Sequence, residues 1–198
     1  MRTTWKAISS CCLLLAALAL AGCASSSSDS PSSAEVAAAR VNREIELGSP
    51  ALVGGDTIPS RYTCDGGNAP LPLQWTSVPP GTKELALLIL SLRPVRASEG
   101  RVTETVVVLW AAVGLRPTLR QITAGHPPRG AIVGRDAQGH TTYSICPPKG
   151  ARQNYLLALF ALPRAIAAVP GFSDETLFAE LSKARVPFGQ LLVNYTRA

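Results

Sequence analysis

The residue types that most often carry catalysis are scarce in this 198-residue chain. Only two histidines occur, His126 and His140, and both lie in polar, glycine-containing surroundings. Their spacing provides no zinc-ligand pattern, and the sequence contains no Gly-x-Ser-x-Gly elbow, phosphate loop or dinucleotide-binding turn. Carboxylates suited to acid–base chemistry occur at Asp56, Asp65 and Asp136, but their spacing favours turn or surface roles. The residues therefore argue against an enzyme, a metal site or a bound cofactor.

The beginning of the chain carries a different kind of chemistry. Arg2 and Lys6 precede an apolar and small-residue stretch at residues 11–22, a pattern typical of a secretory signal. The stretch is shorter than the ~20 residues that span a bilayer. Residues 20–23, Leu-Ala-Gly-Cys, resemble the lipobox of bacterial lipoproteins. This resemblance implies cleavage before Cys23 and a diacylglyceryl group on its sulfur; an ordinary signal with an incidental cysteine is the alternative.

The anchor sets the expected domain organisation. Residues 1–22 are expected to be the signal peptide and residues 23–48 a lipidated tether, because residues 24–33 are mostly serine. Residues 34–47 could form a short helix within this tether. Residues 49–198 are expected to form one domain. We therefore expect an exported protein, bound to membrane lipid through acylated Cys23, with its domain on the extracytoplasmic side of the cell membrane.

The charge of the mature chain is mild. Loss of Arg2 and Lys6 leaves 17 basic and 13 acidic residues, an excess of four, and the charges are scattered. Non-specific attraction to anionic headgroups is compatible with this excess. A nucleic-acid partner is not expected, because the chain has neither a basic cluster nor a recognition motif.

The remaining sequence predicts a mainly β domain. Four apolar segments bounded by turn residues are expected to be strands, at residues 85–92, 102–115, 154–162 and 190–196. A helix is expected from Asp174 to about Ala184, capped by Ser173, with Leu177, Phe178 and Leu181 facing the core. Many strands and one late helix predict an antiparallel two-sheet β-sandwich with one or two short helices near the C-terminus.

Two cysteines and two tryptophans remain to be placed in this domain. Cys64 and Cys146 would meet an oxidising compartment after export, which favours a disulfide over two buried thiols. Trp75 and Trp110 lie beside apolar residues and are expected in the core rather than in a ligand platform.

Three motifs give the domain a family resemblance. Residues 58–68 read Ile-Pro-Ser-Arg-Tyr-Thr-Cys-Asp-Gly-Gly-Asn, residues 146–150 read Cys-Pro-Pro-Lys-Gly, and the C-terminal pattern contains Leu191, Tyr195 and Arg197. Together they resemble the phosphatidylethanolamine-binding protein family, most closely its bacterial, Raf-kinase-inhibitor-like branch. The resemblance implies a two-sheet β-sandwich with a small anion-binding pocket. It also places the two domain cysteines in separate motifs, which is compatible with a disulfide.

The sequence departs from that family at the pocket itself. The usual acidic segment is replaced by Ser-Leu-Arg-Pro-Val at residues 91–95, and Leu109 and Gln153 stand where the family has histidines. Thr142 replaces a tyrosine. Imidazoles and acids together can grip a phosphate, so the usual anion pocket is expected to be degenerate. By position, the pocket residues would be Ser91, Arg93, Leu109, Trp110, Thr142, Tyr143, Pro147 and Gln153.

These observations leave several functions open. The leading hypothesis is a membrane-anchored, non-catalytic binding domain whose ligand is a lipid headgroup, another small molecule or a protein. The alternatives are an inhibitor or regulator of another envelope protein, acting through its surface, and residual binding of phosphate or a phospholipid headgroup through Arg93. An open cavity lined by Ser91, Arg93, Leu109 and Gln153 would favour a small ligand, whereas a cavity filled by Leu109 would favour a surface partner.

Overall fold

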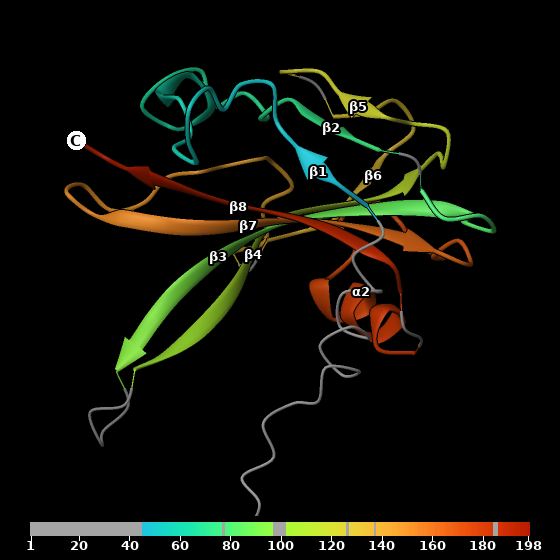
Figure 1. Ribbon diagram of the computed structural model, residues 1–198. Helices are drawn as coiled ribbons and strands as arrows, with labels where there is room; N and C mark the ends of the chain where they lie inside the picture. The colour runs from blue at the N-terminus through green and yellow to red at the C-terminus, as the bar shows by residue number, and fades with distance from the viewer. Residues whose placement is uncertain (1–44, 77, 97–101, 126, 137, 184–185) are drawn as a thin grey trace, which may run out of the picture.

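The computed structural model describes residues 45–198, except for residues 77, 97–101, 126, 137 and 184–185. The expected signal peptide, Cys23 and most of the expected tether lie outside the described residues. Within the described part of the chain, two antiparallel sheets lie face to face with a short helix beneath them (Figure 1). The mainly β, two-sheet fold expected from the sequence is thereby confirmed.

The larger sheet contains all four strands expected from the apolar segments. Its strands follow the order β6-β4-β3-β7-β8 and are all antiparallel. Their bounds are β3 (Glu84–Arg96), β4 (Val102–Leu115), β6 (Ile132–Val133), β7 (Arg152–Leu162) and β8 (Phe188–Thr196). Only β4 has the bounds that the sequence predicts, while β3, β7 and β8 each begin earlier, and β3 also runs further.

The smaller sheet is built from strands too short to predict. Its order is β1-β2-β5, with bounds β1 (Leu47–Gly48), β2 (Leu73–Trp75) and β5 (Gln121–Ile122). The expectation that the tether or its helix extends to residues 45–48 is wrong. Ile45 and Leu47 are buried on either side of exposed Glu46, and this alternation is that of a strand. The folded domain therefore includes Ile45 to Gly48.

The larger sheet is buried on both faces, which explains its nearly continuous apolar strands. Along β3, Leu85, Leu87 and Ile89 pack into an inner core shared with the smaller sheet. Ala86, Leu88 and Leu90 pack into an outer core on the opposite face. Trp75 and Trp110 are 6% and 5% exposed within the inner core, as expected from their apolar neighbours.

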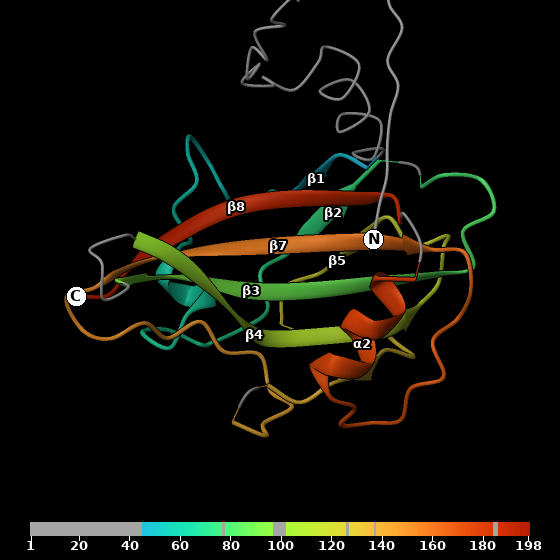
Figure 2. The same cartoon turned by 90° about the horizontal axis from the view of Figure 1, so that it is seen from below.

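Helix α2 (Asp174–Leu181) covers the outer face of the larger sheet (Figure 2). Leu177 is fully buried there, and Leu181 is partly buried. The expectation that Phe178 faces the core is wrong, since its side chain is 42% exposed. Adjacent helical residues are about 100° apart around the axis, so a two-turn helix that buries Leu177 turns Phe178 towards solvent.

The start of the helix also differs from the expectation. The Ser173 side chain makes no capping hydrogen bond to a backbone N–H group. Its Oγ lies 3.3 Å from Oγ1 of Thr176, while the Thr176 N–H donates to the Ser173 carbonyl at 3.1 Å. None of the helices described is long and apolar enough to cross a membrane.

One end of β3 leaves the body of the sheet. Pairing with β7 stops at Leu92, and the residues from Arg93 to Arg96 pair only with β4. Pro94 is tolerated here because this part of β3 has an open edge on the β7 side. The resulting two-stranded ribbon projects from the domain (Figure 1) and brings Arg93 to the rim of the cavity described next.

Candidate functional site

A cavity of about 390 Å³ lies beside the point where the β3–β4 ribbon leaves β7. Strands β3, β4 and β7 supply one wall, and the loop that precedes β7 supplies much of the other. The cavity is lined by Asn68, Ser91, Arg93, Leu109, Asp136, Gln138, His140, Thr142, Ser144, Cys146, Pro147, Pro148, Gln153 and Tyr155.

The structure brings together six of the eight pocket positions taken from the family resemblance: Ser91, Arg93, Leu109, Thr142, Pro147 and Gln153. The other two positions do not line the cavity. Trp110 faces the inner core rather than the cavity. Tyr143 is also buried in that core, where its hydroxyl donates a hydrogen bond of 3.0 Å to the Tyr62 carbonyl.

A β-bulge directs Leu109 towards the cavity. Ile89 pairs with Trp110 and the next residue, Leu90, pairs with Val108, so Leu109 is the extra residue in β4. A bulge of this kind re-aims a side chain. Leu109 and Trp110 consequently both contact the inner core, whereas Val108 packs into the outer core. Leu109 forms part of the wall and leaves the cavity open.

An acid–imidazole pair occupies the opposite wall. Asp136 Oδ1 accepts hydrogen bonds from the backbone N–H groups of Gln138 and His140 at 2.9 and 2.7 Å. Its Oδ2 lies 3.2 Å from Nδ1 of His140. Burial raises the pKa of Asp136, but the two backbone N–H groups and the imidazole together hold the pKa below its ordinary value. Asp136 is therefore an anion at neutral pH beside an imidazole that is 67% exposed.

The sequence reasoning missed this pair. The sequence favours a turn or surface role for Asp136 and places His140 in polar, glycine-containing surroundings, and neither observation indicates a shared site. An aspartate followed by a glycine and a histidine within four residues is a turn signal. The structure shows that the two side chains meet, and the packing of the loop places them on the cavity wall.

Two further groups can donate hydrogen bonds to an anion in the cavity. Arg93 is exposed and lines it from β3. Tyr155 is 2% exposed, and burial is the largest cause that raises its pKa to about 12, against the opposing effect of the Arg93 charge. The Tyr155 hydroxyl therefore stays protonated at physiological pH and remains a potential donor.

Asn68, which also lines the cavity, carries an unsatisfied hydrogen-bond acceptor. The Asn68 amide nitrogen donates a hydrogen bond of 2.9 Å to the Tyr143 carbonyl, whereas its Oδ1 is buried without a partner among the described residues. A buried oxygen in this state normally gains a donor from a ligand or water. By contrast, the Gln153 amide donates to the Leu92 and Asn154 carbonyls and is thereby held against the strands.

A disulfide fixes the rim of the cavity. Cys64 and Cys146 are joined, as the sequence favoured, across a sequence separation of 82 residues. Nearby, Asp65 accepts hydrogen bonds from the Tyr195 hydroxyl at 2.8 Å and from Arg197 Nε at 3.0 Å. The Tyr195 hydrogen bond is the largest influence on Asp65 and, with Arg197, holds its pKa below the ordinary value. The first motif, the second motif and the C-terminus are thus tied together.

In the described part of the chain, no group of three or more His, Cys, Asp or Glu side chains is placed to hold a metal ion. The cavity instead offers the Arg93 cation, the Tyr155 hydroxyl and the His140 imidazole, together with acceptors at Asp136 and Asn68. Such a set can bind a small ligand that carries a phosphate or carboxylate together with a donor group.

Comparison with known proteins matches most of this domain. The family model described as phosphatidylethanolamine-binding protein covers residues 48–195. A UPF0098 protein of Methanothermobacter thermautotrophicus is 30% identical over 146 residues, which cover 71% of this chain and 91% of that protein. LppC of Mycobacterium tuberculosis, which is named as a lipoprotein, is 30% identical over 129 residues, covering 64% of this chain and 60% of LppC.

The solved structures agree on the fold. The phosphatidylethanolamine-binding protein homologue CT736 of Chlamydia trachomatis superposes with a TM-score of 0.67 at 23% identity, covering 79% of this chain and 99% of CT736. At that identity the likeness supports the shared sandwich rather than a shared ligand.

Proposed function

This chain belongs to the phosphatidylethanolamine-binding protein family, and from that premise we propose that it is a lipid-anchored, non-catalytic binding module. Its proposed ligand is a small phosphate-bearing molecule or a phospholipid headgroup. The observation that carries the proposal is the open cavity in which Arg93 lies with the Asp136–His140 pair. The family's usual pocket groups are absent at residues 91–95, 109 and 153. We propose that Arg93 and the groups around it bind an anion in their place.

The arrangement of charges favours a ligand with two kinds of polar group. A phosphate could accept a charge-assisted hydrogen bond from Arg93 and a further hydrogen bond from the Tyr155 hydroxyl, while the Asp136–His140 pair borders the same space. An ammonium or hydroxyl group of the same ligand could donate to the unpartnered Asn68 Oδ1 or to Asp136. A zwitterionic headgroup meets both requirements with a cationic donor, whereas inorganic phosphate has only its own P–OH groups as donors.

Arg93→Gln should weaken ligand binding by about tenfold or more. A charge-assisted hydrogen bond is worth roughly 1.5–3 kcal/mol, and about 1.4 kcal/mol is tenfold in affinity. Calorimetry and thermal shift with inorganic phosphate and with glycerophosphoethanolamine would measure this loss. Tighter binding of glycerophosphoethanolamine would identify a headgroup site, and equal binding would identify a phosphate site.

Lys83→Gln is the matched control, because Lys83 is exposed and does not line the cavity. It should bind both probes like the unaltered protein. If the unaltered protein showed no thermal stabilisation at millimolar concentrations of either probe, the proposed anion site would be wrong. A partner bound through the surface would then be the better account of this domain.

The lipid anchor is part of the same proposal. It is supported by the Leu-Ala-Gly-Cys segment at residues 20–23 and by the similarity to LppC. Attachment of two or more acyl chains gives stable membrane binding, whereas a single chain gives only marginal binding. In this location the domain would meet ligands of the envelope rather than those of the cytosol.

Cys23→Ser should release the protein from the membrane fraction and abolish its labelling by radioactive palmitate. Cys12→Ser is the control, because Cys12 lies in the segment expected to be removed and should leave labelling unchanged. Palmitate labelling that survived in Cys23→Ser would show that the lipid is attached elsewhere or that the anchor is misassigned.

A further inference from the structure

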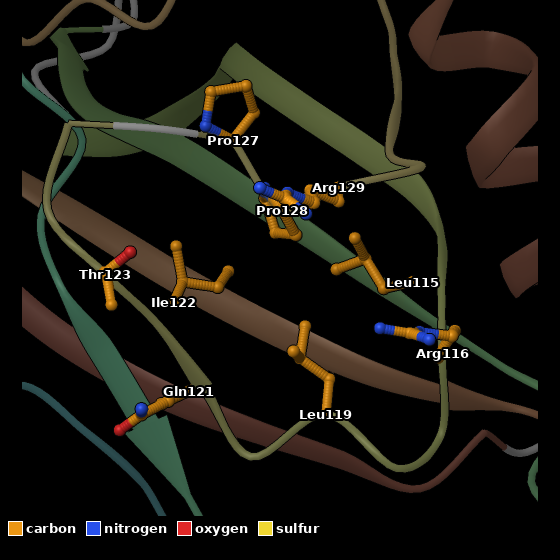
Figure 3. Close-up of a pocket in the computed structure, with 9 residues that line it drawn as sticks. All are labelled: Leu115, Arg116, Leu119, Gln121, Ile122, Thr123, Pro127, Pro128 and Arg129. Carbon is orange, nitrogen blue, oxygen red and sulfur yellow. The ribbon is translucent and has the colours of Figure 1, made fainter.

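A second cavity lies towards the other end of β4 and shares no lining residue with the first. Its volume is about 780 Å³. Leu109 and Leu115, which line the two cavities, are separated by about 20 Å of strand at ~3.3 Å per residue. The chain leaves β4 at Leu115, passes through β5 and returns to β6, and this excursion surrounds the second cavity (Figure 3). It is therefore a separate place on the molecule.

One side of this cavity is apolar. Leu115 and Ile122 are 1% and 6% exposed and belong to the inner core, and Leu119 packs against that core. Pro127 and Pro128 face them across the opening (Figure 3). These side chains form a surface on which an alkyl chain can be removed from water.

The rim of the cavity is cationic. Arg116 and Arg129 line it, and Figure 3 shows the guanidinium group of Arg116 pointing towards its interior. Among the described residues neither arginine forms an ion pair. The surrounding sequence supplies no neutralising acid, because residues 105–135 contain no aspartate or glutamate. An anion would therefore meet two charges that this stretch leaves uncompensated.

The walls are held by hydrogen bonds within the loop. Arg120 donates from Nη1 to the carbonyl groups of Pro117 and Leu119 at 2.6 and 2.8 Å. The Leu119 N–H closes a turn by donating to the Arg116 carbonyl at 3.0 Å, and a similar turn follows Pro128. Arg120 thus stabilises its own loop through these hydrogen bonds, whereas Arg116 and Arg129 are the arginines that can bind a ligand.

From this combination we propose that the second cavity binds a single-chain amphiphile with an anionic head, such as a fatty acid. The alkyl chain lies on Leu115, Leu119 and Ile122, and the head is held by Arg116 and Arg129. Guanidinium groups bind carboxylates and phosphates through paired, charge-assisted hydrogen bonds. The ligand class follows from the pairing of an apolar wall with two cations, and it is independent of the first cavity.

The test uses the chain from residue 23 onward with Cys23→Ser, since every residue of both cores lies between Ile45 and Tyr195. Dodecanoate, kept below its micelle concentration, should bind in calorimetry. The double variant Arg116→Gln and Arg129→Gln should bind it at least about tenfold more weakly. Leu119→Gln should also weaken the binding of dodecanoate, because it places a polar side chain on the apolar wall. Binding of dodecyl phosphate but not of dodecanoate would support the same site with a ligand that has a phosphate head.

Two controls make the result specific. Arg152→Gln removes an exposed arginine that lines neither cavity and should leave binding unchanged. Amide chemical shifts should move within residues 115–131, and not at Asn68 or His140. Equal binding of dodecanoate and dodecyltrimethylammonium, or unaltered dodecanoate binding by a folded double variant, would overturn the proposal. Shifts confined to the first cavity would overturn it too.

Discussion

Replacing Cys64 and Cys146 by serine should lower the free energy of unfolding by about 2–5 kcal/mol. The disulfide closes a loop of more than eighty residues, with a sequence separation of 82, and a long closed loop restricts the unfolded chain strongly. It also joins the first motif to the cavity rim, so its loss frees both segments at once. Urea unfolding of the double variant and of the unaltered protein, each oxidised, measures the difference.

Reduction provides an internal control for that experiment. The reduced, unaltered protein should unfold at the same urea concentration as the double variant, and the double variant should be insensitive to the reductant. If the variant and the oxidised protein had equal stability, the bond would contribute nothing to the fold. Labelling of both thiols in the denatured, unreduced protein would show that the bond is absent.

Leu177→Ala should cost about 2–5 kcal/mol of stability, the range for truncating a fully buried leucine. Leu177 is the fully buried residue of α2 and belongs to the same outer core as Leu88, Leu90 and Val113 of the larger sheet. Truncation removes its transfer free energy and leaves a cavity between the helix and the sheet. Urea unfolding, with the unfolding slope checked for two-state behaviour, gives the magnitude.

Phe178→Ala is the matched control for the helix. Phe178 is the larger side chain, yet it is 42% exposed, so its truncation should cost less than about 1 kcal/mol. Sequence periodicity alone would assign similar costs to both residues. Equal losses in the two variants, or a larger loss in Phe178→Ala, would mean that the helix packs in a different orientation.

The long strands were predictable because a strand that is buried on both faces appears in the sequence as a continuous run of apolar residues. The run from Leu85 to Leu90 is wholly apolar, which identifies a buried strand without indicating which residues face which core. Strands β1, β2 and β5 have two or three residues each, too few for an alternating pattern to stand out. These strands form because they pair with one another and cover the inner core. Their partners are distant in the sequence, so no short segment of the chain indicates the pairing.

The candidate site also has a part that the sequence predicted and a part that it did not. Family resemblance located six wall positions of the first cavity, because strand position is transferable between related sequences. Trp110 does not line the cavity, because its side chain is buried in the inner core. The resemblance also missed the Asp136–His140 pair, because it pointed to lost histidines at two other positions. A replacement group from a neighbouring loop can be found only when the loop is seen in three dimensions.

Arg93 is the first residue of β3 beyond the end of its pairing with β7, and this position has a thermodynamic consequence. Backbone segments with one hydrogen-bonded neighbour open more readily than those with two. A ligand that engages Arg93 must therefore order the ribbon as well as displace water from the cavity, and ordering reduces the net affinity. Filling of the cavity by a ligand that binds Arg93 should therefore slow amide hydrogen exchange in residues 93–96.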